Sequence, residues 1–143
     1  ACENNVVTPA LDAIIEATVY LSGVGADNVN CAAPHSFYNG VTSLGGHEAY
    51  HGNCVAFGTL IQLTLECADK AEFEDIQNFC LEVGLPITLA ELGDFTDEDL
   101  HTIAKNACVK GETIHNLAGD VTPDELYAAI IATDALGKAI LGK

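Results

Sequence analysis

Two histidines have the residue type and the setting of ligands in a metal site. His35 and His51 each stand at the start of an apolar run with helical spacing, and Gly45 and Gly46 separate the two runs. A neutral imidazole binds Zn²⁺ through a ring nitrogen, and a catalytic zinc usually has three protein ligands and one open position. The two histidines would therefore need one more ligand. The 21 acidic residues offer many carboxylates, but no spacing singles one out.

The two imidazoles can meet only if the chain returns to its starting level between them. A helix over residues 34–44 advances about 15 Å at about 1.5 Å per residue. The connection 45–50 spans up to about 20 Å at about 3.3 Å per residue. The next helix can therefore begin beside the start of the previous one, which would place His35 and His51 at the same end of a helical bundle.

A second metal hypothesis uses an overlapping motif. The segment His47-Glu48-Ala49-Tyr50-His51 is an H-E-x-x-H sequence, which on a helix would give two zinc ligands and the general base of a metalloprotease. Glycines stand immediately on either side, which disfavours a continuous helix. No third histidine follows at the spacing of the extended motif, so a downstream glutamate would have to complete the site. The two remaining histidines, His101 and His115, are expected to have surface or capping roles.

The helices that would position these residues follow from apolar periodicity and capping signals. No strand-like alternation of any length occurs, so the sequence predicts an all-α bundle of six or seven helices forming one domain over 1–143. The third helix is apolar nearly all the way round, which is typical of a helix buried among others. The predicted helices cover residues 9–23, 34–44, 51–68, 73–83, 88–93, 97–109 and 123–141.

Composition limits the possible partners. The chain has 143 residues, 49% of them hydrophobic, and a formal charge of −16 from 21 acidic and five basic residues. This charge repels phosphate backbones and anionic headgroups, so nucleic-acid and membrane partners are not expected. No apolar stretch approaches the roughly 20 residues of a membrane span. The N-terminus lacks the features of a signal peptide. The absence of methionine is compatible with removal of an initiator methionine before Ala1 and also with a piece of a longer protein.

The six cysteines stand singly, with no C-x-x-C motif. They are therefore expected to be free thiols packed as small apolar residues in a reducing cytoplasm. Their positions are Cys2, Cys31, Cys54, Cys67, Cys80 and Cys108.

Three segments give the chain a resemblance to a known family. The sequences AAPHSFYNGVTSL, HGNCVAFGTLIQL and TPDELYAAIIATDALGK are similar to the C-terminal helical domain of the glycerol dehydrogenases, in the iron-containing alcohol dehydrogenase superfamily. The resemblance extends over most of the chain. It departs from the family pattern at Pro34, at Asn53-Cys54 and in a slightly shorter interval between the two histidines.

The resemblance implies a function for the two histidines. His35 and His51 would be ligands of a catalytic zinc that binds the substrate hydroxyl while hydride passes to NAD. It also implies a third ligand, an aspartate, upstream of this sequence, a polyol substrate and a homo-oligomer. The chain contains no G-x-G-x-x-G turn, so NAD would bind to a nucleotide-binding domain that is absent from this chain. Alone, the chain is expected to be inactive.

A third hypothesis is a non-catalytic helical module. In this case the histidines would only cap helices, and the acidic faces would contact other subunits. An isolated C-terminal half would also expose an apolar patch on one side of the bundle, where it packs against its missing partner domain.

Overall fold

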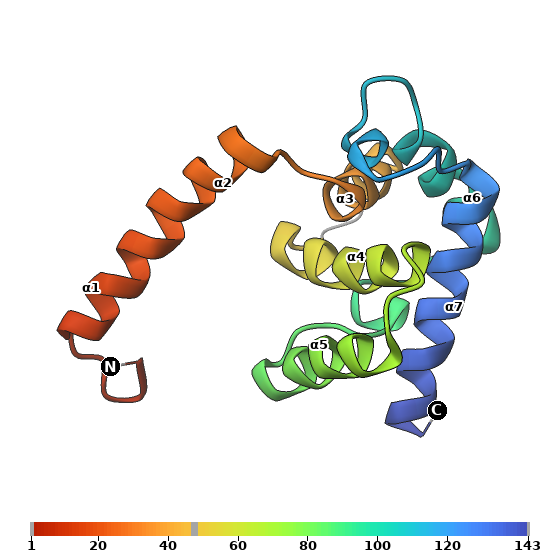
Figure 1. Ribbon diagram of the computed structural model, residues 1–143. Helices are drawn as coiled ribbons and strands as arrows, with labels where there is room; N and C mark the ends of the chain where they lie inside the picture. Colours follow the sequence, from red (N-terminus) through yellow and green to blue (C-terminus); the bar gives the residue numbers. More distant parts are fainter. Residues whose placement is uncertain (1, 47–48, 143) are drawn as a thin grey trace. The chain divides into compact units, whose positions relative to one another are not determined.

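The computed structural model describes residues 2–46 and 49–142 (Figure 1). In this part of the chain the regular structure is entirely helical, which confirms the predicted all-α fold and the number of helices. The α-helices are α1 (Pro9–Glu16), α2 (Ser22–Val29), α3 (Ala33–Ser43), α4 (His51–Leu65), α5 (Lys70–Val83), α6 (Asp97–Ala107) and α7 (Pro123–Leu141). The chain divides into two units between Cys31 and Ala32.

The first unit consists mainly of one long helix. The Thr8 side chain accepts a hydrogen bond of 3.2 Å from the Leu11 N–H, and Pro9 follows it at the first helical position. α1 continues through the π-helical η2 (Ala17–Leu21) into α2, and the helix ends at Asn30, where φ is +64°.

The predicted end of this helix at Gly23 is wrong. Helical structure continues to Val29, although two glycines, Gly23 and Gly25, lie within it. An interior glycine costs only about 1 kcal/mol relative to alanine, so it weakens a helix without necessarily ending it.

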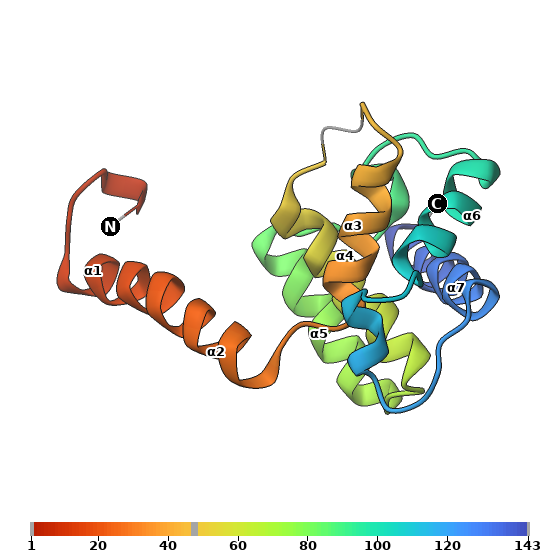
Figure 2. The ribbon, with the colours of Figure 1, turned by 90° about the horizontal axis from the view of Figure 1, so that it is seen from above.

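The second unit is a bundle built around α4. α3 packs against α4 and α6, and α4 also packs against α5 and α7. Figure 2 shows α3 alongside α4, and in Figure 1 α5 returns beside α4 after a short connection. The side chains of Phe57, Leu60 and Ile61 on α4 are completely buried, which agrees with the prediction that this helix lies among others.

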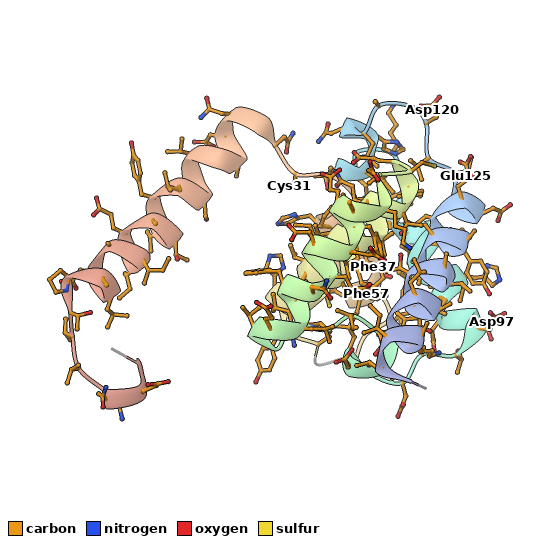
Figure 3. All side chains as sticks on the ribbon, turned by 60° about the horizontal axis from the view of Figure 1, so that its bottom comes forward. Cys31, Phe37, Phe57, Asp97, Asp120 and Glu125 are labelled. Atoms are coloured by element: carbon orange, nitrogen blue, oxygen red, sulfur yellow. The ribbon has the colours of Figure 1, made fainter. Side chains whose placement is uncertain are left out.

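The aromatic centre of the bundle joins α3 to α4. Phe37 and Phe57 are both fully buried, and their ring centroids are 5.7 Å apart at an interplanar angle of 56°. In Figure 3 these two rings lie between the helices, whereas Asp97, Asp120 and Glu125 lie at the periphery. The three acidic residues are exposed, so this part of the negative charge faces solvent.

The helix ends follow the sequence signals closely in the second half of the chain. α6 and α7 both begin with capping boxes, formed by Thr96 with Asp99 and by Thr122 with Glu125. α5 ends at Gly84, which has the left-handed conformation of a C-cap. The predicted helix at 88–93 is a short 3₁₀ turn, η3 (Leu89–Glu91), and the sequence analysis did not predict two further such turns, η1 (Cys2–Asn4) and η4 (Thr113–Asn116).

Four of the described cysteines, Cys54, Cys67, Cys80 and Cys108, are free thiols. Cys54 and Cys80 are buried, as predicted, and burial raises the pKa of both thiols. The expectation of packed thiols is wrong for Cys67, which is exposed at the end of α4. No helix in residues 2–46 and 49–142 combines the length and the apolar character that crossing a membrane requires.

Candidate metal centre

The structure brings the two predicted ligands together. His35 lies in the first turn of α3, and His51 is the first residue of α4. Their ring centroids are 5.2 Å apart, and the ring planes are tilted by 57°. His35 is half-buried and His51 is exposed, so the pair lies at the surface of the second unit.

This separation is compatible with a shared metal ion. Zinc–imidazole bonds are about 2.0–2.1 Å long, and a tetrahedral zinc therefore holds the centres of two bound rings about 5 Å apart. Two neutral nitrogen donors also suit zinc chemically. The observed spacing requires no rearrangement of the backbone to meet this condition.

The protonation of His35 also favours a role as a ligand. Burial lowers the pKa of His35 below its usual value, and the nearby His51 imidazole lowers this pKa further. A lower pKa increases the fraction of neutral imidazole near pH 7. Only the neutral form has a free electron pair to donate to a metal.

A close backbone contact holds the first turn of α3 against the middle of α4. A Cβ atom at Gly58 would lie 2.7 Å from the Cα of Pro34, a distance too short for any side chain. α4 can therefore approach the first turn of α3 closely only because residue 58 is glycine. Pro34 directly precedes His35, so this contact positions one of the two ligands.

A buried hydroxyl group fixes the same turn of α3 from another side. Ser36 is fully buried and accepts a hydrogen bond of 2.7 Å from the Ile114 N–H in η4. The Thr113 hydroxyl lies 3.0 Å from the Ser36 hydroxyl and donates a 2.8 Å hydrogen bond to the Ala32 carbonyl. The beginning of α3 is thus tied to a segment almost 80 residues away.

An aromatic side chain adjoins the histidine pair. The ring of Tyr38 meets the ring of His51 edge-on, with centroids 4.4 Å apart and an interplanar angle of 84°. The sequence analysis did not identify Tyr38, Ser36 or Gly58. The position of Tyr38, three residues after His35 and thus on the same helix face, was the one available signal.

A third ligand does not come from the described part of this chain. Among residues 2–46 and 49–142, no group of three histidine, cysteine, aspartate or glutamate side chains has an arrangement that could hold a metal ion. As the ligands of a catalytic zinc, His35 and His51 would therefore need a third group from elsewhere.

The metalloprotease hypothesis fits the structure poorly. His47 and Glu48 lie outside the described residues, but the end of the motif can be compared with its helical requirement. Tyr50 has an extended backbone with ψ of 138°, and α4 begins only at His51. The residue before His51 is therefore not helical, whereas the H-E-x-x-H arrangement requires a continuous helix up to its second histidine.

The other two predicted histidines lie elsewhere on the surface. His101 stacks on Tyr127, with ring centroids 4.0 Å apart, and its Nε2 lies 3.8 Å from an oxygen of Asp97. The Nε2 of His115 lies 3.2 Å from the carbonyl oxygen of Val109. Both residues are exposed, in agreement with the surface roles expected for them.

Comparisons with known proteins give a consistent result. A glycerol dehydrogenase of Pseudomonas putida is 47% identical over 99% of this chain, which covers 40% of that protein. A glycolaldehyde reductase of Halobacterium salinarum is 42% identical over 98% of this chain. The chain thus spans about 40% of the length of these curated relatives. No family model matches it.

Solved structures resemble the whole fold. A probable glycerol dehydrogenase of Sinorhizobium meliloti 1021 superimposes with a TM-score of 0.89 and 41% identity, covering 96% of this chain and 40% of that one. The glycerol dehydrogenase of Schizosaccharomyces pombe gives a TM-score of 0.85 and 34% identity. The similarity therefore includes both the order of the helices and their packing.

Proposed function

Since the chain corresponds in sequence and fold to the C-terminal helical part of the glycerol dehydrogenases, we propose that it is the metal-binding part of an NAD-dependent polyol dehydrogenase. In this proposal His35 and His51 are two ligands of a zinc ion. The observation that carries the proposal is the distance of 5.2 Å between their ring centroids. The resemblance to glycerol dehydrogenases and the distance between the two rings each support His35 and His51 as the zinc ligands.

The proposed reaction is the oxidation of a secondary hydroxyl group, as in the conversion of glycerol to dihydroxyacetone. Hydride passes from the carbon to NAD⁺, and the hydroxyl proton is released. A zinc ion at the site would supply a Lewis acid that lowers the pKa of the hydroxyl. The residues of this chain would hold the ligand pair at a fixed spacing, and the burial of His35 would lower the pKa of its imidazole and so favour the neutral form.

We further propose that the rest of the protein completes the site. The third zinc ligand and the NAD site would both lie outside this chain, since the described residues supply no third ligand. The exposure of the long helix in the first unit supports the proposal that another part of the protein covers it. None of its described residues is buried, and large apolar side chains are exposed along it. The exposed apolar residues of this unit are Val6, Val7, Ile14, Ile15, Val19, Tyr20, Leu21 and Val24.

Glycerol is the proposed substrate because most of the similar proteins are named glycerol dehydrogenase. The glycolaldehyde reductase of Halobacterium salinarum has a similar level of identity, so a two-carbon carbonyl compound is the alternative. The free thiols of Cys54, Cys67, Cys80 and Cys108 are compatible with a reducing cytoplasm. A homo-oligomer is expected from the resemblance.

Metal analysis of the protein at its natural length tests the proposal. We expect about one zinc per chain in the unmodified protein and a loss of at least 10-fold in zinc affinity in both His35→Ala and His51→Ala. His115→Ala is the matched control, because this exposed histidine in η4 lies beside the Val109 carbonyl, and its replacement should leave the zinc content unchanged. NAD-dependent oxidation of glycerol and reduction of glycolaldehyde, measured on the same samples, would identify the substrate.

Two results would contradict the proposal. Zinc binding that survives His35→Ala but not His47→Ala would favour the metalloprotease motif. A protein of natural length that is folded but binds no zinc or other transition metal would favour the non-catalytic module.

A further inference from the structure

Tyr38 is placed to control the orientation of His51. It lies one helical turn beyond His35 on α3, and its ring edge contacts the His51 ring at a centroid distance of 4.4 Å. Tyr38 is half-buried and packs against the main hydrophobic core of the second unit. The ring that contacts His51 is therefore anchored in the bundle.

Among the described residues, few other contacts restrict the side chain of His51. It is exposed at the first position of α4, where the side chain of the N-cap residue Tyr50 makes no capping hydrogen bond. Within residues 2–46 and 49–142 its ring has no hydrogen bond or ion pair, and its two ring contacts are with His35 and Tyr38. Both of these contacts come from α3, so among the described residues this one helix constrains the orientation of the His51 ring.

We propose that Tyr38 is a positioning residue that holds the His51 ring in the orientation needed to share a metal ion with His35. This inference rests on the proposed metal function. An edge-to-face contact favours one relative orientation of two rings. Restricting His51 before the metal binds reduces the entropy lost on binding, which is the general effect of preorganisation. The role requires the aromatic ring of Tyr38 and not its hydroxyl group.

Cobalt(II) binding to the protein at its natural length tests this role without measuring catalysis. Cobalt replaces zinc in such sites, and its visible absorption reports the geometry of the ligands. We expect Tyr38→Leu to weaken cobalt binding about 3- to 10-fold and to alter the absorption spectrum. Tyr38→Phe keeps the ring and should restore the wild-type affinity to within about two-fold.

Tyr127→Leu is the matched control. Tyr127 is also half-buried and also contacts a histidine ring, that of His101, but this pair joins α6 to α7. Its replacement should leave cobalt binding unchanged, even if it lowers the stability of the bundle.

The possible results separate the two proposals. If His51→Ala abolishes cobalt binding and a folded Tyr38→Leu variant binds like wild type, the role of Tyr38 is wrong and the metal function stands. An equal loss in Tyr38→Phe and Tyr38→Leu would assign the effect to the hydroxyl group and also overturn the inference. A wild-type protein that binds no cobalt would overturn both proposals.

If Tyr38→Leu does not fold, the contact can be tested in unmodified protein. A nuclear Overhauser effect between ring protons of Tyr38 and His51 is expected in the metal-free state. Its absence would overturn the inference.

Discussion

The helices that begin at Pro9 and at Pro123 start in the same way but differ in what surrounds them. Thr8 accepts a hydrogen bond from the Leu11 N–H at 3.2 Å, and Thr122 accepts one from the Glu125 N–H at 3.3 Å. The helix from Pro9 to Val29 has no buried residue among those described, whereas α7 has six. The buried residues of α7 are Leu126, Ala129, Ile130, Thr133, Asp134 and Gly137.

This contrast separates two contributions to helix structure. Capping residues and local propensity determine where a helix begins, and they act in the same way in both units. Burial depends on the presence of other elements to pack against, and most helical stability in proteins comes from such packing. The first unit thus has the local signals of a helix without a core in this chain.

The largest expected effect is the loss of a buried aromatic ring in the second unit. Phe57→Ala should lower the free energy of unfolding by about 3–5 kcal/mol, because it leaves a cavity beside Phe37. Ile15→Ala in the first unit should change it by no more than about 0.5 kcal/mol, because this side chain is 53% exposed. Urea denaturation of the 143-residue chain measures both values.

A large effect of Ile15→Ala in this chain would contradict the contrast between the two units. If Ile15→Ala lowers the free energy of unfolding strongly only in the protein at its natural length, the contrast between the two units is supported. That result would indicate that the rest of the protein covers the first helix.

A smaller effect is expected from the hydroxyl group that anchors α3. Ser36→Ala should cost about 1–2 kcal/mol, because the buried Ile114 N–H loses its acceptor. Ser22→Ala in the exposed helix of the first unit is the control, with a change of at most about 0.5 kcal/mol. Thermal unfolding followed by circular dichroism measures this difference. Equal effects of the two substitutions would show that the Ser36 network does not stabilise the bundle.

The smallest effect concerns the two matched N-caps. Thr122→Ala and Thr8→Ala should each destabilise their own helix by about 1 kcal/mol. Only Thr122→Ala should lower the midpoint of the main unfolding transition, because α7 is part of the packed bundle. Hydrogen exchange of backbone amides should report the Thr8→Ala effect locally, as faster exchange near Leu11. A shift of the main transition by Thr8→Ala would mean that the first helix unfolds together with the bundle.

Much of the fold could be predicted from the sequence because its signals are local. The Thr122-Pro123 start of α7 and the Gly84 end of α5 depend on residues that are close together in the chain. The errors occur where local signals are weak. Gly23 does not end its helix, and η4 is a short turn held by contacts with α3 that periodicity does not reveal.

In the candidate site, too, some features could be predicted from the sequence and others depend on the fold. Residue types and spacing identified His35 and His51, and the length of the connection between them allowed the two rings to meet. Their separation of 5.2 Å depends on other parts of the bundle. Gly58 permits the close contact with Pro34, and Ser36 bonds to Ile114, 78 residues further along the chain.

The amino-acid sequence is sufficient to predict an all-helical chain, most helix ends and the two histidines near the starts of α3 and α4. Caps, prolines and apolar periodicity act over one or two turns, so they can be recognised without a structure. The packing of the first turn of α3 against α4, the contact of Tyr38 with His51 and the absence of buried residues among those described in the first helix can be known from the folded structure alone. These features result from packing between distant segments, because the close approach of two backbones depends on the shapes of both surfaces.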